Sequence, residues 1–320
     1  MRITINTNTK KVMVTGGAGF IGSHLAEELV LRGYSTVVLD NLSSGSSDNI
    51  QHLREKANFH FINGSINDTA LLAEASMGID FIFHHAALTS VPQSVEDFYN
   101  YHRVNLTGTL NVLEAAKRNG VKKVIFASSS SVYGNNPLSP NTEDMPPTPQ
   151  SPYAVTKLSA EYYCEVFKLV FSLSTICLRY FNVYGPRQNA NSPYSAVIPK
   201  FINAIEQNKQ PVIFGDGTQT RDFVFVKDIV NANILAAESN STGIYNIGSG
   251  QELTLNYLLS TIIKQMNKEN IKPIYQKERV GDIKHSLANI NKAKIFGYTP
   301  TYTLEQGLME VIKSDNSVVN

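Results

Sequence analysis

Short apolar, β-branched runs alternate with helical patterns along the first half of the chain. The runs predicted as strands are Lys11–Thr15, Ser35–Asp40, Asn58–Ile62, Asp80–His85, Lys123–Ser128 and Ser174–Tyr180. Helical periodicity follows several of them, notably over Ile21–Arg32 and Thr107–Asn119. Short apolar strands separated by helices are typical of a parallel sheet covered on both faces. The pattern predicts an α/β fold with a doubly wound parallel sheet, whose ligands lie beyond the carboxyl ends of its strands.

The alternation becomes less regular in the second half. Asn135–Pro152 contains six prolines and few backbone donors, so it is predicted to be an irregular connector. It leads into Tyr153, and we therefore expect it near the functional site. Further helices are predicted at Ala196–Gln207, Lys227–Ser239 and Leu255–Asn267, and Phe223–Gly248 has a strand–helix–strand pattern.

Composition narrows the class of protein. The 320 residues are 42% hydrophobic and 17% charged, which is ordinary for a globular protein. A net charge of +1 without runs of Lys or Arg indicates no basic surface of the kind that binds nucleic acid. Cys164 and Cys177 lie in apolar patterns and are predicted to be buried thiols of a reducing compartment. Met1–Lys10 is polar and no long apolar run follows, so we expect a cytoplasmic protein without a membrane segment, and we predict no metal site.

Gly17-x-Gly19-x-x-Gly22 follows the first predicted strand and opens a helix. Glycines there allow a tight turn, close approach of the backbone to a pyrophosphate, and close packing of helix on strand. Asp40 ends the next strand, where a carboxylate accepts hydrogen bonds from ribose hydroxyls and repels a 2′-phosphate. No Arg follows in Asn41–Ser47, so the pattern favours NAD over NADP.

Tyr153 is followed four residues later by Lys157, and Ser151-Pro152 before it is a typical helix start. The two side chains then share one helix face. A phenol with a pKa of ~10 needs about 4 kcal/mol of stabilisation to act as a base near pH 7. One ammonium ~4 Å away, at an effective dielectric constant of ~20, supplies about that much. This pair predicts a proton-abstracting tyrosine, although a surface tyrosine beside a solvated lysine would have the same spacing.

Four consecutive serines, Ser128–Ser131, follow the strand that begins at Lys123. One of their hydroxyls at the sheet edge would be able to hydrogen-bond both a substrate hydroxyl and the tyrosine. The residues alone do not identify which serine has this role.

These features predict two domains. Residues 1–180 form an NAD-binding Rossmann domain, to which 223–248 returns. Residues 181–222 and 249–320 form a smaller C-terminal α/β lobe that binds the substrate.

The chain resembles the extended short-chain dehydrogenase/reductases and, within them, the NAD-dependent nucleotide-sugar 4-epimerases. The stretches that carry the resemblance are Val14–Ser23, Asp40–Leu42, His84–Ala87, Asn105–Thr109, Ser128–Gly134, Ser151–Tyr153 with Lys157, Leu178–Asn182, Thr220–Phe223 and Arg279–Asp282. They span almost the whole chain, so the resemblance implies both the fold and the chemistry: an isomerase that inverts C4 of a UDP-sugar through a transient 4-keto sugar.

The resemblance also implies roles for individual residues. Ser129, Tyr153 and Lys157 correspond to the catalytic set. The residues implied for NAD are Gly16, Gly19, Phe20, Ile21, Gly22, Asp40, Asn41, Ser43, Ser65, Ile66, Ala86, Ala87, Thr89, Asn105, Tyr153, Lys157, Tyr180 and Phe181. The residues implied for the nucleotide sugar are Ser129, Tyr153, Asn182, Val197, Val212, Phe214, Arg221, Arg279, Asp282 and Ser286.

Two departures from the family pattern bear on function. Ser65 stands where relatives carry Asp before the adenine-contacting Ile66, which leaves at most a hydroxyl contact there. Sugar 4,6-dehydratases have Asp-Glu after the catalytic Thr, and Ser130-Ser131 occupy those places here. Without that acid–base pair, dehydration of the sugar is not expected.

In relatives, the residue at the position of Ser286 forms part of the wall of the sugar pocket, and bulky residues there exclude N-acetyl groups. A serine leaves room, which favours UDP-N-acetylglucosamine and UDP-N-acetylgalactosamine and still allows UDP-glucose and UDP-galactose, although a surface serine is the simpler alternative. A UDP-glucuronate epimerase or decarboxylase would share the Tyr/Lys pair. A non-catalytic regulator that senses NAD is the alternative from another class. The resemblance further implies a homodimer formed through the helices Thr107–Asn119 and Ala154–Phe171.

Overall fold

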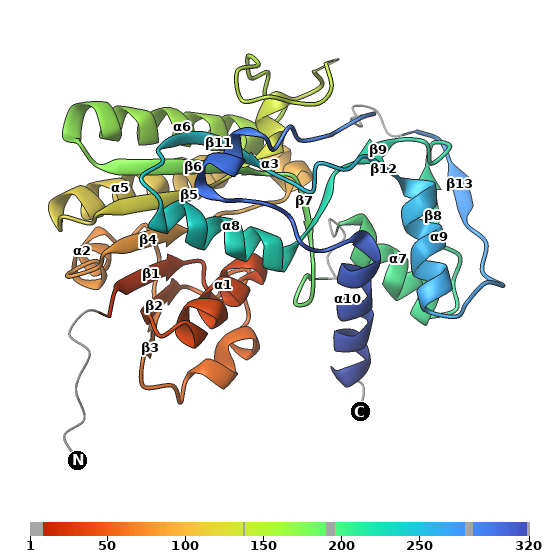
Figure 1. Ribbon diagram of the computed structural model, residues 1–320, viewed down its shortest axis with the longest axis horizontal. Helices are drawn as coiled ribbons and strands as arrows, with labels where there is room; N and C mark the ends of the chain where they lie inside the picture. Colours follow the sequence, from red (N-terminus) through yellow and green to blue (C-terminus); the bar gives the residue numbers. More distant parts are fainter. Residues whose placement is uncertain (1–8, 137, 190–195, 279–283, 319–320) are drawn as a thin grey trace. The chain divides into compact units, whose positions relative to one another are not determined.

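The computed structural model describes residues 9–136, 138–189, 196–278 and 284–318, with only the backbone of 315–318 (Figure 1). The chain divides into two compact units. Unit 1 consists of Met1–Ser128, Ser151–Leu178 and Asn233–Ile244, and unit 2 of Ser129–Gln150, Arg179–Ala232 and Tyr245–Asn320.

A seven-stranded sheet with the order β11-β6-β5-β4-β1-β2-β3 forms the centre of the fold. Its strands are β1 (Lys11–Thr15), β2 (Ser35–Asp40), β3 (Phe59–Asn63), β4 (Phe81–His84), β5 (Lys123–Ser129), β6 (Ser174–Tyr180) and β11 (Gly243–Ile247). The pairs from β5 across to β3 are parallel, with Val12 opposite Thr36 of β2 on one side and Phe81 of β4 on the other. Because parallel strands end at the same edge, the segments after β1, β2 and β4 gather there.

The six predicted strands all form, with bounds that differ by no more than two residues. The predicted fold class, a doubly wound parallel α/β sheet, is confirmed. Within Phe223–Gly248, the second strand, β11, lies at one edge of this sheet. The first, β10 (Phe223–Phe225), pairs instead with β7 (Asn182–Tyr184) in a separate parallel pair.

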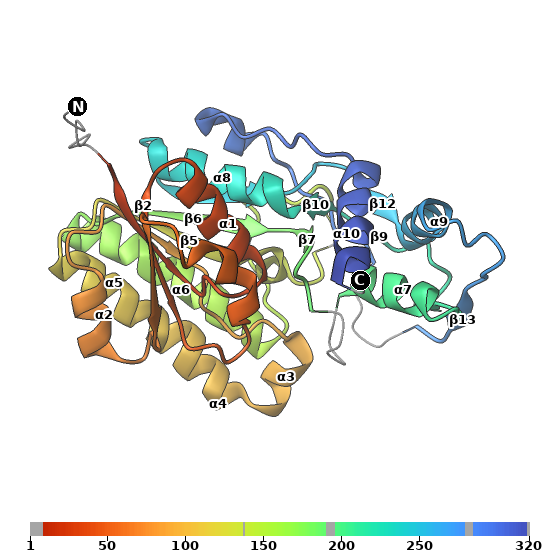
Figure 2. The same cartoon turned by 90° about the horizontal axis from the view of Figure 1, so that it is seen from below.

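Helices cover both faces of the sheet in unit 1 (Figures 1 and 2). They are α1 (Phe20–Leu31), α2 (Thr69–Ala75), α3 (Val91–Glu96), α4 (Phe98–Tyr101), α5 (Gly108–Arg118) and α6 (Pro152–Phe171), with a 3-10 helix η1 (Ser47–Leu53) and a π-helix η2 (His102–Thr107). One core cluster joins Met13, Leu39 and Phe126 of the sheet to α2, α5 and α6. Burial of such apolar side chains contributes roughly 25 cal/mol per Å² of surface removed from water, and it fixes α6 against β5.

Unit 2 is built from short elements. They are the 3-10 helices η3 (Ser130–Tyr133) and η4 (Lys292–Phe296), the helices α7 (Val197–Glu206), α8 (Val226–Glu238), α9 (Leu255–Gln265) and α10 (Leu304–Val318), and the strands β7, β8 (Val212–Phe214), β9 (Thr220–Arg221), β10, β12 (Leu253–Thr254) and β13 (Ile274–Gln276). The end of α8 belongs to unit 1. Beyond β7–β10, the strands pair as β8–β13 and β9–β12. The Phe225 ring packs at a tilt against the rings of Tyr184 and Tyr302, where β7 and β10 meet the chain before α10.

The proline-rich connector has neither helix nor strand among its described residues up to Ser151, as predicted, and its last residue, Pro152, begins α6. It is nevertheless anchored, because Asn141 forms a parallel bridge with Ala288. The N–H of Asn141 donates to the Leu287 carbonyl at 2.8 Å, and its carbonyl accepts from the Asn289 N–H at 2.9 Å.

Two further sequence expectations have structural counterparts. Cys164 and Cys177 are buried free thiols, as predicted. Among the described residues, no helix has the length and apolar character needed to cross a membrane.

Candidate active site

The turn between β1 and α1 depends on glycine at two points. Gly16 has a φ of +70°, and a Cβ there would lie 2.6 Å from the Ala86 N atom. A Cβ on Gly22 would lie 2.2 Å from the Gly16 carbonyl oxygen. Backbone cannot yield as a flexible side chain does, so these glycines let α1 and the segment after β4 approach the turn.

Asp40 ends β2 and braces this turn. Its two carboxylate oxygens accept hydrogen bonds from the Ala18 N–H at 2.9 Å and from the Leu42 N–H at 2.8 Å. Each oxygen keeps a further lone pair for a ligand hydroxyl. Asn41 and Ser43 are exposed beside it, and the Asn41 side chain accepts from the Ser43 N–H at 3.2 Å.

These features fit a dinucleotide. Helix α1 begins at Phe20 and Ile21 with Gly19 as a cap that lacks a side chain, so the N–H groups of the first turn lack carbonyl partners within the helix. Such donors, together with the positive end of the helix dipole, suit a pyrophosphate. The carboxylate of Asp40 suits the ribose hydroxyls of NAD and would repel a 2′-phosphate.

The residues predicted near the adenine differ in exposure. The Ser65 hydroxyl accepts from the Asn67 N–H at 3.1 Å, which forms a tight turn after β3. Ile66 is buried in the core cluster, and its carbonyl accepts from the Asn111 side chain at 3.1 Å. A Cβ on Gly108 would lie 2.4 Å from Ile66 Cδ1, so α5 packs tightly here.

The segment after β4 is held by Asn105, a buried residue of the π-helix η2. Its side chain accepts from the Leu88 N–H at 2.8 Å and donates to the Leu88 carbonyl at 2.9 Å and to Thr156 Oγ1 at 3.2 Å. Ala86 and Ala87 are half-buried on this segment, and Thr89 is exposed. No periodicity in the sequence indicated the π-helix, a distortion that is frequent at functional sites.

Helix α6 starts as the sequence predicted. The Ser151 hydroxyl accepts from the Ala154 N–H at 3.2 Å, and Pro152 occupies the first turn. Tyr153, 9% exposed, and Lys157, 5% exposed, then lie on one face. The Lys157 Nζ atom lies 6.0 Å from the centre of the Tyr153 ring and donates to the Ala127 carbonyl of β5 at 2.7 Å. The alternative of a solvated surface pair is therefore wrong.

Burial shapes the charge of this pair. It lowers the pKa of Lys157 to about 8, while the Glu161 carboxylate one turn later acts in the opposite direction. His84 at the end of β4 is buried and His85, which follows it, is half-buried. Burial together with the Lys157 charge lowers the pKa of each imidazole to about 3. Both imidazoles are neutral near pH 7, so Lys157 is the cation that can stabilise a Tyr153 phenolate.

Ser129 ends β5 and caps η3, where its Oγ accepts from the Ser131 N–H at 3.2 Å. That contact leaves the Ser129 hydroxyl proton available for donation. Tyr180 and Phe181 at the end of β6 are buried, and the Phe181 ring lies 6.3 Å from the Tyr133 ring.

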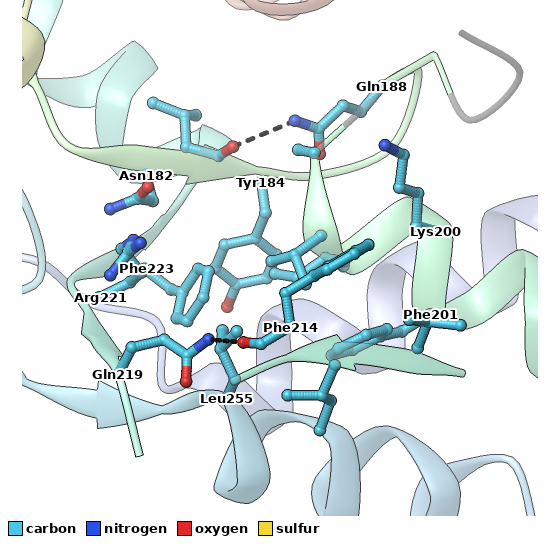
Figure 3. Close-up of a pocket in the computed structure, with 16 residues that line it drawn as sticks. Asn182, Tyr184, Gln188, Lys200, Phe201, Phe214, Gln219, Arg221, Phe223 and Leu255 are labelled. Atoms are coloured by element: carbon cyan, nitrogen blue, oxygen red, sulfur yellow. Dashed lines mark hydrogen bonds between the residues drawn. The ribbon is translucent and has the colours of Figure 1, made fainter. Parts of the chain in front are cut away.

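A cavity of about 300 Å³ lies within unit 2 (Figure 3). Five residues predicted for the nucleotide sugar line it, namely Asn182, Val197, Val212, Phe214 and Arg221. They come from β7, α7, β8 and β9, so segments up to 39 positions apart in sequence meet around one space. An apolar cavity with a few polar groups is the usual form of a small-molecule site.

Sequence reasoning missed several lining residues, among them Gln188, Lys200, Phe201, Gln219 and Phe223. Gln219 Nε2 donates to the Phe214 carbonyl at 2.6 Å, and Gln188 Nε2 donates to the Val183 carbonyl at 3.3 Å (Figure 3). Phe223 ends the Thr220–Phe223 stretch that carries the family resemblance but was given no role, and no motif marked the other four.

Three predicted residues lie in or after the segment 279–283. Arg279 and Asp282 fall outside the described residues. Ser286 is 9% exposed, so the alternative of a surface serine is wrong. Among the described residues, no cluster of His, Cys, Asp and Glu side chains is arranged to hold a metal ion.

Comparison with known proteins gives consistent matches. Among solved structures, a UDP-N-acetylglucosamine 4-epimerase from Methanobrevibacter ruminantium M1, in complex with UDP-N-acetylmuramic acid, is 44% identical, with a TM-score of 0.94 over 97% of this chain and 99% of that one. A UDP-glucuronic acid 4-epimerase from Bacillus cereus, in complex with UDP-glucuronic acid and NAD, is 35% identical, with a TM-score of 0.89 over 96% and 99%. The UDP-glucose 4-epimerase of Mycolicibacterium smegmatis is 37% identical over 95% of this chain and 97% of its own.

Residues 12–248, well over half of the chain, match the NAD dependent epimerase/dehydratase family. The match confirms the predicted cofactor, NAD, and the prediction of an enzyme rather than a regulator. The chain belongs to the NAD-dependent epimerase/dehydratase family.

Proposed function

We propose that the protein is a UDP-sugar 4-epimerase that uses Ser129, Tyr153 and Lys157 and keeps NAD bound between turnovers. The observation that carries this proposal is the buried Tyr153–Lys157 pair in the same unit as the glycine turn. The cavity of unit 2, lined by Asn182 and Arg221, supports a nucleotide sugar as the substrate. The 4-epimerase names of the relatives support inversion at C4.

Tyr153 removes the proton from the sugar 4-hydroxyl as C4 is oxidised, and it returns a proton when C4 is reduced. NAD, when bound, supplies the acceptor and then the donor of one hydride. The Ser129 hydroxyl orients the sugar oxygen, and Lys157 stabilises the phenolate. The 4-keto sugar turns about its diphosphate linkage between the two half-reactions, so C4 is inverted without net oxidation.

A sugar panel tests this function. The purified protein is incubated with UDP-, dTDP- and GDP-sugars without added NAD, and the products are separated by chromatography. We expect interconversion of the C4 epimers of a UDP-sugar. Release of a 4-keto-6-deoxy sugar, a decarboxylated sugar or no product at all would contradict the proposal.

We further propose UDP-N-acetylglucosamine and UDP-N-acetylgalactosamine as the preferred substrates. Ser286 is small and buried, which supports room for the 2-acetamido group, and the relative from Methanobrevibacter ruminantium acts on UDP-N-acetylglucosamine. Ser286→Tyr should lower kcat/KM for the acetylated sugar by about tenfold or more, because a larger side chain fills that room. Activity on UDP-glucose serves as the internal control, and an unchanged preference would contradict the pocket-size argument.

UDP-glucuronate is the second candidate, because a relative of 35% identity binds it. Its C6 carboxylate needs a cationic or hydroxyl partner. In the same panel, a higher kcat/KM for UDP-glucuronate than for UDP-N-acetylglucosamine would replace the preferred substrate and leave the 4-epimerase mechanism intact.

We also propose that the protein forms a homodimer through α6. Its outer face exposes Val155, Tyr162, Val166 and Leu169, the last to 70%. These positions recur at helical spacing, so they form one apolar stripe of the kind that marks an interface. Leu169→Glu should convert a dimer to a monomer in light scattering, and a wild-type protein that is already monomeric would contradict this proposal.

A further inference from the structure

Asp222 is fully buried in unit 2, between Arg221 and β10, and it does not line the cavity. One carboxylate oxygen accepts from the Ser249 N–H at 2.6 Å and from the Ser249 hydroxyl at 2.7 Å. The other accepts from the Gly250 N–H at 3.0 Å and from the Ala288 N–H at 3.1 Å. Burial raises the pKa of this carboxyl, and the donors act in the opposite direction. The ionised form fits this set of four donors.

The backbone of Asp222 reaches a further segment. Its carbonyl accepts from the Asn182 N–H at 3.0 Å and from the Asn182 side chain at 3.3 Å. Its neighbours in sequence, Arg221 and Phe223, both line the cavity, as does Asn182. Ala288, which donates to the carboxylate, is two residues after Ser286. One buried residue therefore joins the segments that carry three proposed substrate contacts: Asn182, Arg221 and Ser286.

The neighbouring chain segments leave little space around the Asp222 carboxylate. A Cβ on Gly248 would lie 2.7 Å from Asp222 Oδ2 and 2.8 Å from the Ala288 Cβ. The Gly248 carbonyl in turn accepts from the Tyr298 hydroxyl at 2.7 Å. The turn at Gly248–Gly250 and the segment at Ala288 therefore close directly on the charged group, without room for another side chain.

We propose that Asp222 is a positioning residue for the nucleotide sugar: its carboxylate ties the segment of Arg221 to the Ser249–Gly250 turn and to the segment of Ser286 and Ala288, and its backbone carbonyl holds Asn182, in the geometry that binds substrate. This role rests on the proposed function of the cavity. Asp222 has no exposed atom with which to touch substrate, so it acts through those three side chains.

Asp228 provides a matched control in the same unit. It is also buried, and its carboxylate accepts from the Thr301 N–H at 2.9 Å, from the Thr301 hydroxyl at 2.8 Å and from the Tyr302 N–H at 3.2 Å. It therefore holds a backbone turn as Asp222 does. Thr301 and Tyr302 belong to the segment before α10, which carries none of the proposed substrate contacts, so loss of this carboxylate should disturb structure without disturbing those contacts directly.

The experiment compares Asp222→Asn with Asp228→Asn in the full chain. An amide presents N–H groups where N–H donors already point, so both variants should lower the melting temperature. We expect Asp222→Asn to raise the Kd for UDP, measured by calorimetry, and the KM for the UDP-sugar about tenfold or more, with kcat changed less than about threefold. Asp228→Asn should leave both binding constants within about twofold of wild type.

A milder pair of variants removes one hydroxyl donor from the Asp222 carboxylate and one from the Asp228 carboxylate, in case the first variants do not fold. Ser249→Ala should raise the Kd for UDP about threefold, while Thr301→Val should not change it. The inference is overturned if Ser249→Ala or Asp222→Asn binds UDP as wild type does, or if the Asp228 pair weakens binding equally. Wild-type protein that binds UDP without epimerising any sugar would instead contradict the proposed function alone.

Discussion

The two units hold their candidate functional residues by different means. In unit 1 these residues lie mainly at the ends of β1, β2 and β4, in the π-helix η2 and in the first two turns of α1 and α6, where regular elements fix the backbone. In unit 2 the cavity is lined by helix α7, short strands and loops, and buried polar side chains such as Asp222 tie segments of this unit together. Regular secondary structure positions the proposed chemistry, and side chain-to-backbone hydrogen bonds position the proposed substrate contacts.

This difference predicts how single substitutions act. A group in unit 1 with a unique chemical role has no substitute, so its loss should be severe. The proposed substrate contacts in unit 2 are spread over many residues, so the loss of one lining group should be mild. A clamp such as Asp222, which serves several segments at once, is the expected exception.

The largest effect is expected at Tyr153. Tyr153→Phe removes the proposed proton acceptor and should lower kcat about 10³-fold, within the range of general acid–base catalysis, while UDP binding is retained. Steady-state rates on the preferred UDP-sugar and UDP calorimetry measure the two quantities. Tyr99→Phe, which removes a hydroxyl from a 78% exposed tyrosine of the same unit, is the control. Near wild-type turnover by Tyr153→Phe would contradict the claim that unit 1 holds a catalytic group without a substitute.

The same contrast explains what could be predicted from the sequence. The strands and the start of α6 follow from local signals, namely apolar β-branched runs and the Ser151-Pro152 cap, and they formed as predicted. The π-helix around Asn105 follows from long-range bonds to Leu88 and Thr156, so no local pattern marks it.

In unit 2 the sequence-based prediction depended on resemblance. Asn182 and Arg221 were named in that way, and both line the cavity. Gln219 and Asp222 were missed as functional residues. The partners of Asp222, Ser249 and Ala288, lie 27 and 66 positions away in sequence, and the partner of Gln219, Phe214, is near in sequence but no motif marks the contact. A buried polar residue can be interpreted only when its partners are known.

The next effect is expected at Asp40, which braces the glycine turn. Asp40→Ala leaves the Ala18 N–H without its acceptor and removes the proposed ribose contact, which should raise the Kd for NAD about 30-fold, or ~2 kcal/mol. Asp80→Ala is the control, because Asp80 also accepts a backbone N–H, that of Lys11 in β1 at 2.8 Å, but precedes β4 at the opposite edge of the sheet. Equal loss of NAD affinity in both variants would show a general effect of destabilisation.

Lys157 gives a pH dependence in which activity and stability diverge. Its pKa is lowered to about 8 from 10.5 by burial, so the ammonium that supports the phenolate is lost above that pH. We expect kcat to be roughly eightfold lower at pH 9 than at pH 7.5, as for one group that must stay protonated. The unfolded chain binds more protons than the folded chain between these two pKa values, so the contribution of Lys157 to stability rises across the same window.

Rate and denaturant unfolding measured across pH 7–10 test this divergence. Lys123→Met is the control. Lys123, in β5, is also a buried lysine, and its Nζ donates to the Ala236 carbonyl at 3.1 Å. That variant should lose stability and keep the alkaline fall in rate. If the alkaline fall in rate disappears in Lys123→Met, the fall reflects the general stability of unit 1 and not the titration of Lys157.

The smallest effect is expected at Gln219 in unit 2. Gln219→Leu leaves the Phe214 carbonyl without its 2.6 Å hydrogen bond, and a net loss of ~1 kcal/mol should raise the Kd for UDP about fivefold. Gln210→Leu is the control, because Gln210 makes a similar bond to the Lys272 carbonyl at 3.1 Å outside the cavity. A loss at Gln219 as large as that at Asp222 would mean that single cavity contacts, and not the buried clamp, dominate binding in this unit. A Kd for UDP raised about fivefold in Gln219→Leu, together with a larger increase in Asp222→Asn, would show that the buried carboxylate contributes more to binding than one residue that lines the cavity.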